Sequence, residues 1–350
     1  MISYQIIEHG QPLQKRVFSN PQPTGSEVLM RITRAGVCHS DLHIWDGYFD
    51  LGGGKRFYVK ERGCIPPFTL GHEPFGIVEA VGKKAKGVKV GQKRLIYPWI
   101  GCGKCAVCKA GQDNYCVSGT RVLGVNRPGA YSTHVLVPDP KYLIDTAGID
   151  DSFASTLACS AVTVYSAINK LPELGAKDSV AVLGCGGLGL IAISVLRAKG
   201  VKNILACDID DAKLAAALQQ GAKSTVNTRS PDAAQKLAGI AAAVDLVGAP
   251  ATAALGIGAL RKGGRYVICG LFGGELTHPL PPIAQRAIGI QGSYVGNLQE
   301  LKEVVALTKK KKIKPSPIET RPADQANAAL EDLKAGRVLG RIVLDFDTVQ

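Results

Sequence analysis

Apolar and polar residues follow one pattern in the first part of the chain and another after Pro172. Residues 26–36 alternate between apolar and polar, and residues 76–97 form short Val- and Ile-rich runs separated by glycines and lysines. Both patterns are typical of strands and turns. The first 150 residues therefore predict a β-rich domain, and the glycine-bearing stretch 47–67 predicts a long exposed loop.

After Pro172, predicted strands alternate with predicted helices. The strands are short apolar runs, and the helices show helical periodicity and end near glycines. The expected order is strand 179–183, helix 188–199, strand 203–207, helix 211–220, strand 243–247, helix 251–260 and strand 264–270. Repeated strand–helix units predict an α/β fold with a doubly wound parallel sheet. A helix begins near Leu298, and we expect a last strand, 341–346, to return to the first domain.

Length and composition describe a folded chain of two domains. With 350 residues the chain is too long for one ordinary core, and 46% hydrophobic with 20% charged residues is typical of a globular protein. The chain start lacks a basic segment followed by an apolar one, and no apolar run is long enough to span a membrane. We therefore expect a cytoplasmic protein that does not bind a membrane.

The net charge of +13 raises nucleic acid as a partner, because clustered lysines gain from phosphate neutralisation. The basic residues are mostly scattered, however, and the one dense run is Lys309–Lys314. This run follows an amphipathic stretch and precedes Pro315, which is typical of a solvated helix end. We expect no nucleic-acid partner, with polyanion binding by this run as the alternative.

Four of the ten cysteines lie within fifteen positions, in the spacing C-x2-C-x2-C-x7-C. They are Cys102, Cys105, Cys108 and Cys116. Thiolates at this spacing can converge on one tetrahedral zinc ion, and a large chain without a leader favours metal ligation over disulfides. The alternatives are two disulfides or four small packed residues. Four further cysteines are expected to be ordinary free thiols: Cys64, Cys185, Cys207 and Cys269.

A glycine-rich turn lies between predicted strand 179–183 and the helix that follows it. The sequence Gly184-Cys-Gly186-Gly187-Leu188-Gly189 matches the pattern G-x-G-x-x-G, and its residues are the candidate cofactor contacts. In this setting the backbone N–H groups at the helix start can bind a pyrophosphate. Asp208 follows Gly189 by nineteen residues, where a carboxylate accepts from a ribose 2′-hydroxyl and favours NAD over NADP. The alternative is that Asp208 caps the next helix. Lys213 is a second candidate contact to the ribose.

Two further segments supply a thiolate, imidazoles and carboxylates. They are Cys38-His-Ser-Asp-Leu-His43 and Gly71-His72-Glu73. Together with the four cysteines and the glycine turn, in this order, these segments resemble the medium-chain zinc alcohol dehydrogenase family from Glu27 to Asp345. The resemblance implies a GroES-like catalytic domain built from residues 1–160 and 297–350, with a structural zinc lobe at about 99–117. It also implies a Rossmann domain at 161–296.

The resemblance assigns a role to each matching residue. Cys38, His72 and Cys159 would hold a catalytic zinc, with Glu73 beside it and Asp41 orienting His72. Ser40 and His43 would pass the proton of the alcohol to water. His39 and Arg341 would face the cofactor phosphates. The cofactors implied are NAD and two Zn²⁺ ions per chain, one catalytic and one structural.

Three aromatic residues near these segments are candidate walls of a substrate pocket: Trp45, Phe49 and Trp99. An apolar lining predicts an apolar primary or secondary alcohol, or the matching aldehyde or ketone, as substrate; ordinary packing is the alternative for each ring. A polyol dehydrogenase of the same superfamily is the nearest alternative function, followed by a zinc-free quinone reductase-like enzyme and an inactive binding protein that keeps the fold. The resemblance implies a homodimer or homotetramer.

Overall fold

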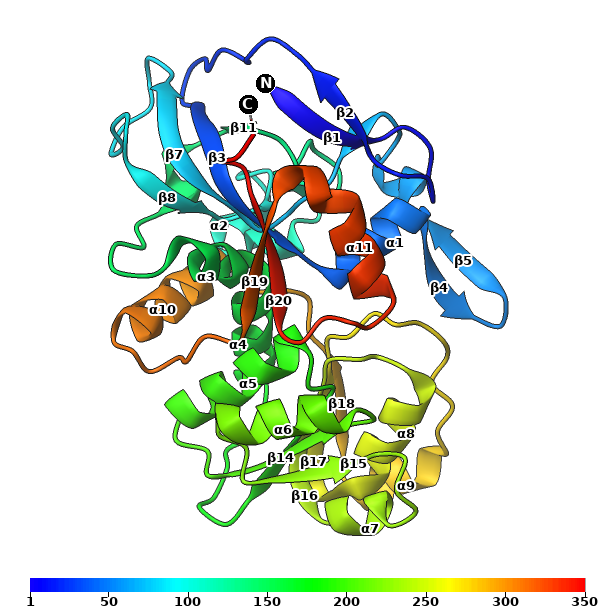
Figure 1. Ribbon diagram of the computed structural model, residues 1–350. Coiled ribbons are helices and arrows are strands. Elements are labelled where there is room, and N and C mark those ends of the chain that lie inside the picture. Colours follow the sequence, from blue (N-terminus) through cyan, green and yellow to red (C-terminus); the bar gives the residue numbers. More distant parts are fainter. Residues whose placement is uncertain (350) are drawn as a thin grey trace.

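A computed structural model describes residues 1–349, and its two large sheets divide the molecule. Figure 1 shows a β-rich part that contains both chain ends above a part in which helices surround a parallel sheet. Among residues 1–349, no helix has the length and apolar character needed to cross a membrane. All ten cysteines are free thiols, so the alternative of two disulfides in the four-cysteine run is wrong.

Seven strands from both ends of the chain form the first large sheet. Its order is β12-β8-β7-β3-β20-β19, and β11 also pairs with β3. The strands are β3 (Val28–Val37), β7 (Pro74–Val81), β8 (Lys93–Ile96), β11 (His134–Val137), β12 (Leu143–Ile144), β19 (Ile318–Pro322) and β20 (Arg341–Asp345). Most residues of β3 are buried, as expected for a central strand. Because Ile342 lies opposite Val37 in the antiparallel pairing of β20 with β3, the predicted return of the last strand is confirmed.

Shorter strands and helices border this sheet. The strands are β1 (Ile2–Ile6), β2 (Gln14–Val17), β4 (Tyr48–Gly52), β5 (Lys55–Tyr58), β6 (Phe68–Thr69), β9 (Trp99–Ile100) and β10 (Arg121–Val122). The helices are α1 (His39–Asp46), α2 (Ala106–Lys109) and α11 (Ala326–Lys334), with short turns η1 (Val59–Arg62), η2 (Asp113–Tyr115), η3 (Pro140–Tyr142) and η5 (Ala323–Gln325).

The stretch 47–67 is a β-hairpin followed by a short helical turn, so its prediction as a loop is wrong. The three consecutive glycines that suggested a loop all have positive φ: Gly52 ends β4, and Gly53 and Gly54 form the tight turn to β5. The hairpin packs closely against residues 273–275. A Cβ added at Gly52 would lie only 2.9 Å from the backbone N of Glu275.

The second large sheet is parallel, with the strand order β15-β14-β13-β16-β17-β18. Its strands are β13 (Ser179–Leu183), β14 (Asn203–Asp208), β15 (Ser224–Asn227), β16 (Ile240–Asp245), β17 (Leu260–Ile268) and β18 (Gly289–Gly292). Its helices are α5 (Gly187–Ala198), α6 (Asp211–Gln220), α7 (Ala233–Leu237), α8 (Pro250–Ala259) and α9 (Leu280–Gln285). This order is that of a dinucleotide-binding Rossmann sheet and confirms the predicted doubly wound topology.

Helices between the two sheets connect them. They are α3 (Asp151–Thr156), the π-helical turn η4 (Leu157–Ala161), α4 (Val162–Ile168) and α10 (Leu298–Lys309). α10 packs against both α4 and η4. It ends at Lys309, so the dense lysine run is a helix end as predicted. The π-helical turn carries Cys159, and such turns often occur at functional sites.

Candidate active site

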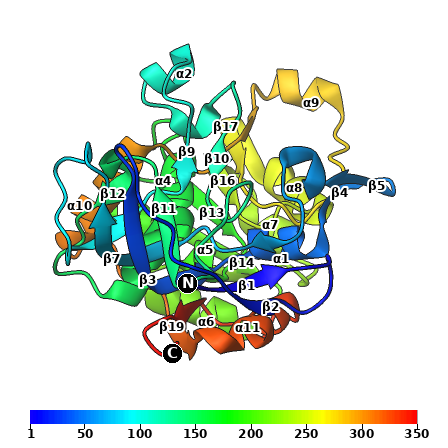
Figure 2. The same ribbon diagram turned by 90° about the horizontal axis from the view of Figure 1, so that it is seen from above.

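The four cysteines of the C-x2-C-x2-C-x7-C run converge in a lobe, residues 102–116, that includes α2 and η2. Figure 2 shows α2 projecting from the body of the molecule. All four sulfurs lie within 4.8 Å of one another. The Cys102–Cys108 and Cys105–Cys116 sulfur pairs are 3.9 and 4.0 Å apart. Four thiolates around one tetrahedral zinc, at the usual zinc–sulfur length, stand about 3.8 Å apart, so these residues fit the ion.

A second cluster lies where the first sheet meets the connecting helices. Cys38 precedes α1, His72 and Glu73 lie between β6 and β7, and Cys159 lies in η4. All four are buried, and one ligand atom from each lies within 4.8 Å of the others. The Sγ atoms of Cys38 and Cys159 are 4.0 Å apart, again close to the spacing expected for thiolates sharing one metal.

The imidazole of His72 is oriented by the fully buried Asp41. Its Nδ1 lies 3.1 Å from Asp41 Oδ1, whereas its buried Nε2 has no hydrogen-bond partner. A buried polar atom without a partner is costly, and a metal ion satisfies it. Because the Nδ1 contact to a carboxylate fixes the proton on Nδ1, Nε2 keeps the lone pair that ligation requires. The donor set of the second cluster therefore also fits zinc.

Asp41 is itself held by two further donors. Its Oδ2 accepts from the backbone N of Cys38 at 2.9 Å and from the Tyr131 hydroxyl at 3.2 Å. Tyr131 arrives beside Asp41 because residues 130–131 pair with Leu70 and Gly71, next to His72. Sequence reasoning missed Tyr131, since it lies ninety residues from Asp41 and belongs to none of the motifs.

Burial and neighbouring charges shift the pKa values in this cluster. Burial raises the pKa of Glu73 to about 7, against the opposing charge of Arg341. The hydrogen bond from Cys159, more than any other cause, lowers the pKa of Cys38. Burial lowers the pKa of His72, but Asp41 and Cys38 outweigh it and raise that pKa. The cluster thus favours a thiolate at Cys38, the form that binds metals.

Arg341 bridges this cluster and the glycine turn. Its guanidinium donates to Glu73, and both side chains are buried. A Cβ added at Gly187 would collide with the Arg341 side chain, so the arginine lies against the turn predicted to bind the cofactor. Its predicted contact with the pyrophosphate stays a prediction, and the pairing with Glu73 is a feature that the sequence did not reveal.

Helix α1 carries the three predicted polar groups His39, Ser40 and His43. Burial is the main cause that lowers the pKa of His39, and Arg341 and Lys213 lower it further, so two cations from other segments lie near this ring. Ser40 and His43 are three residues apart on one helix and therefore share a face. His43 stacks on Phe49, with ring centroids 4.7 Å apart.

The three aromatic candidates differ in position. Trp99 lies beside the metal cluster, with its ring centroid 5.7 Å from that of His72, and its indole N–H donates to Ala158 O at 3.0 Å. Phe49 stacks on His43, the residue predicted to accept the proton. Trp45 is buried against α11, where its indole N–H donates to Gln11 O and the Lys334 ammonium covers its ring. A residue outside the motifs, Tyr294, packs edge-on against Trp99 at 5.8 Å.

The glycine turn joins β13 to α5 with the geometry that a close backbone approach requires. Gly184 has φ of +92°, and a Cβ at Gly189 would collide with the carbonyl of Gly184. At Gly186 a Cβ would meet nothing within 4 Å, so this face of the turn is open. The N–H groups of α5 begin here, at the carboxyl end of the sheet, where dinucleotides bind in this topology.

Asp208 ends β14 beside this turn. Its Oδ2 accepts from the backbone N of Cys185 at 2.7 Å, and its Oδ1 accepts from the backbone N of Ile209. The side chain that caps α6 is Asp210, which accepts from the N–H groups of Ala212 and Lys213. The alternative role of Asp208 as the helix cap is therefore wrong, and its ribose contact stays a prediction.

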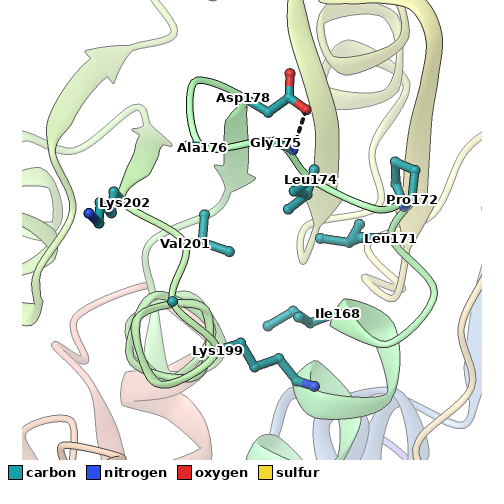
Figure 3. A pocket seen from close by; sticks show the side chains of 11 residues that line it. Ile168, Leu171, Pro172, Leu174, Gly175, Ala176, Asp178, Lys199, Val201 and Lys202 are labelled. Carbon is teal, nitrogen blue, oxygen red and sulfur yellow. Dashed lines mark hydrogen bonds between the residues drawn. The ribbon is translucent and has the colours of Figure 1, made fainter.

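A cavity of about 450 Å³ lies elsewhere, near the loops at the amino ends of β13 and β14. Figure 3 shows apolar side chains such as Ile168, Leu171 and Val201 in its wall, with Lys199 and Lys202 nearby. It contains none of the candidate ligands or cofactor residues. The opposite, carboxyl edge of the sheet carries the glycine turn, so this cavity is separate from the candidate active site.

Comparison with known proteins agrees with this geometry. Residues 24–146 match the family model of the alcohol dehydrogenase GroES-like domain, and residues 187–310 match that of zinc-binding dehydrogenases. The chain is 35% identical to an NAD-dependent alcohol dehydrogenase of Sulfurisphaera tokodaii, over 98% of this chain and 99% of that protein. A second such enzyme, of Saccharolobus solfataricus, is 33% identical over the same shares.

Solved structures show the same architecture. An alcohol dehydrogenase of Aeropyrum pernix superposes with a TM-score of 0.89 at 30% identity, covering 99% of this chain and all of that one. An acetophenone reductase of Geotrichum candidum, solved with NAD, superposes with a TM-score of 0.87 at 27% identity, covering 99% and 98%. The predicted combination of a GroES-like and a Rossmann fold is thus confirmed.

Proposed function

Because the chain belongs to the medium-chain zinc alcohol dehydrogenase family, we propose that it transfers hydride reversibly between an apolar primary or secondary alcohol and NAD. The observation that carries this proposal is the second buried cluster. Two thiols and an unpartnered imidazole nitrogen converge there, while a dinucleotide-binding turn lies against Arg341, which pairs with the cluster. The candidate metal site and the predicted cofactor site are therefore neighbours.

Cys38, His72 and Cys159 would hold the catalytic zinc, and the four-cysteine lobe would hold the structural one. Zinc bound by Cys38, His72 and Cys159 would supply a Lewis acid that lowers the pKa of the alcohol, and NAD would supply the hydride acceptor. Asp41 keeps the imidazole of His72 in the ligating tautomer. Glu73 lies within the cluster but pairs with Arg341, which supports a position beside the metal rather than permanent ligation.

The proton of the alcohol would leave along α1. The Ser40 hydroxyl lies two residues after the predicted ligand Cys38, and His43 follows on the same helical face. Burial lowers the pKa of His43, so the ring is neutral at physiological pH and able to accept a proton. We assign Ser40 as the transfer group and His43 as the base that passes the proton to solvent.

The cofactor would lie across the carboxyl edge of the parallel sheet. The N–H groups of the glycine turn would bind the pyrophosphate, together with His39 and Arg341. Asp208 and Lys213 would contact the adenosine ribose, and the carboxylate explains a preference for NAD. The alcohol would enter between Trp99 and Phe49, whose rings border His72 and His43.

We assign residues 1–160 and 297–350 to the catalytic domain and 161–296 to the Rossmann domain, in keeping with the strands of each sheet.

We also propose a homodimer or homotetramer. β18 is an edge strand, and nearby apolar side chains are exposed: Leu271 (50%), Phe272 (71%), Leu276 (48%) and Leu280 (77%). An unpaired edge beside an apolar surface suits association with a second copy.

The experiment is a panel assay that follows NADH absorbance with primary, secondary, benzylic and polyol substrates, on protein whose zinc has been counted. Two zinc ions per chain and turnover of apolar alcohols support the proposal. The matched variant is Cys38→Ser, for which we expect loss of turnover with NAD binding retained. Full activity of this variant, or turnover of polyols alone, would contradict the proposal.

A further inference from the structure

The segment that leads from β18 to α10, residues 293–297, has an unusual backbone. Val295 has φ of +40°, a region that β-branched residues rarely adopt. At the next position, a Cβ added to Gly296 would lie 2.8 Å from the carbonyl oxygen of Val162. A strained conformation of this kind persists only when its surroundings hold it, and such positions often cluster at functional sites.

Three hydrogen bonds join this segment to residues 97–114. The Asn114 side-chain amide donates to the carbonyl of Tyr294 at 3.2 Å. The Tyr97 hydroxyl donates to the carbonyl of Gly296 at 2.8 Å. The Asn297 amide donates to Gln112 Oε1 at 3.2 Å. Gln112 and Asn114 belong to the four-cysteine lobe and lie four and two residues before its last predicted ligand, Cys116. The lobe is therefore hydrogen-bonded to the segment 293–297, which leads from one sheet to the other.

The side chain of Tyr294 extends from this held backbone toward the candidate metal site. Its ring packs edge-on against Trp99 at 5.8 Å, and Trp99 in turn lies 5.7 Å from His72. Tyr294 is 40% exposed, whereas its neighbour Val295 is buried, so other residues of the chain do not fully cover Tyr294. A continuous series of contacts therefore connects the lobe to a predicted zinc ligand: Asn114 contacts Tyr294, Tyr294 contacts Trp99, and Trp99 lies beside His72.

We propose that Asn114 and Gln112 are positioning residues through which the folded four-cysteine lobe sets the place of Tyr294 and thereby the substrate preference. The proposal rests on the proposed alcohol dehydrogenase function. It gives the lobe a role in recognition, because a change at its attachment shifts an aromatic wall of the substrate space without touching substrate, cofactor or catalytic ligands.

The first test reads the position of Tyr294 without using activity. The chain has two tryptophans, so Trp45→Phe leaves Trp99 as the single fluorescent reporter beside Tyr294. In this background, Asn114→Leu removes the amide donor at similar volume, and we expect a shifted emission maximum of Trp99. Lys109→Ala, an exposed change in the same lobe, is the control and leaves the emission unchanged. An unshifted emission in Asn114→Leu would overturn the proposal.

The second test is a double-mutant cycle on substrate preference. We expect Asn114→Leu to change the ratio of kcat/KM between a bulky secondary alcohol and a small primary one by about 2- to 10-fold, the range of one neutral hydrogen bond. In a Tyr294→Ala background the same substitution should leave the ratio unchanged. An equal effect in both backgrounds would show that Asn114 acts elsewhere and would overturn the proposal.

Two measurements keep these tests decisive. Zinc content and melting temperature establish that each variant is folded and loaded; if Asn114→Leu does not fold, Gln112→Ala replaces it in both tests with the same expected signs. If the unmodified protein oxidises no alcohol of the panel, the proposed function fails, whereas the Trp99 emission still decides whether the lobe positions Tyr294.

Discussion

Substitution of Asp41 by asparagine should weaken the catalytic zinc site without disturbing the fold. The fully buried carboxylate accepts from Cys38 N and the Tyr131 hydroxyl on one oxygen and contacts His72 Nδ1 with the other. Asparagine keeps one acceptor oxygen for the first two donors. Its NH₂ group then faces His72 Nδ1, which must become an acceptor, so the proton moves to Nε2, the atom that ligation requires.

The expected magnitude follows from the contact that is lost. A hydrogen bond to a charged group contributes about 1.5–3 kcal/mol, which corresponds to roughly 10- to 150-fold in an equilibrium constant. This range agrees with the about 10- to 100-fold loss usually seen when a partner of a metal-bound histidine is removed. We therefore expect Asp41→Asn to lower zinc affinity, measured by competition with a chelator, and kcat/KM by comparable factors.

Asp46→Asn is the matched control, because Asp46 lies on the same helix but pairs with Lys334 at the surface. A surface ion pair contributes about 0–1 kcal/mol, so zinc affinity should stay within a few-fold of that of the unmodified protein. Tyr131→Phe removes only one neutral donor and should produce an intermediate loss. Unchanged zinc affinity and activity in Asp41→Asn would refute the role assigned to this carboxylate.

Three further variants test other parts of the molecule. Cys105→Ser should release one of two zinc ions per chain and lower the melting temperature, as counted by elemental analysis and calorimetry; retention of both ions would refute the lobe assignment. Asp208→Gly should narrow the preference for NAD over NADP, measured as the ratio of kcat/KM for the two cofactors, and an unaltered ratio would remove the case for that carboxylate. Asp245→Asn should cost about 1–3 kcal/mol of unfolding free energy, measured in denaturant, because this buried carboxylate accepts from Tyr266, Thr252 and two backbone N–H groups; a stability equal to that of the unmodified protein would contradict this.

The sequence was most informative where chemistry depends on local spacing. The limits of α6 were predicted as 211–220 and are Asp211–Gln220, because an aspartate begins the helix and a glycine with φ of +114° ends it. The four cysteines of the lobe and the glycine turn are likewise short-range patterns. Each can be recognised within a few residues, without knowledge of what lies nearby in space.

Long-range pairing marks what the sequence did not reveal. Tyr131 reaches Asp41, and Arg341 reaches Glu73 across 268 positions, only because strands far apart in the chain are neighbours. Tyr294 lies against Trp99, and its backbone carbonyl accepts from Asn114, because the segment between β18 and α10 runs beside the lobe. The hairpin at 48–58 was missed for a different reason: its glycines form a turn, yet a run of glycines is equally typical of a loop.

The charges of the catalytic cluster explain why so many acidic groups can be buried together. Two thiols and two carboxyls, those of Cys38, Cys159, Asp41 and Glu73, share one buried guanidinium, that of Arg341. Without a metal, the hydrogen bond with Cys38 and burial raise the pKa of the Cys159 thiol, and burial raises that of Glu73, because one guanidinium cannot balance several buried negative charges. A divalent cation held between the two sulfurs and the imidazole would supply the positive charge that both thiols need in order to ionise. The electrostatics of the chain's own residues therefore favour a metal at this position independently of any relative.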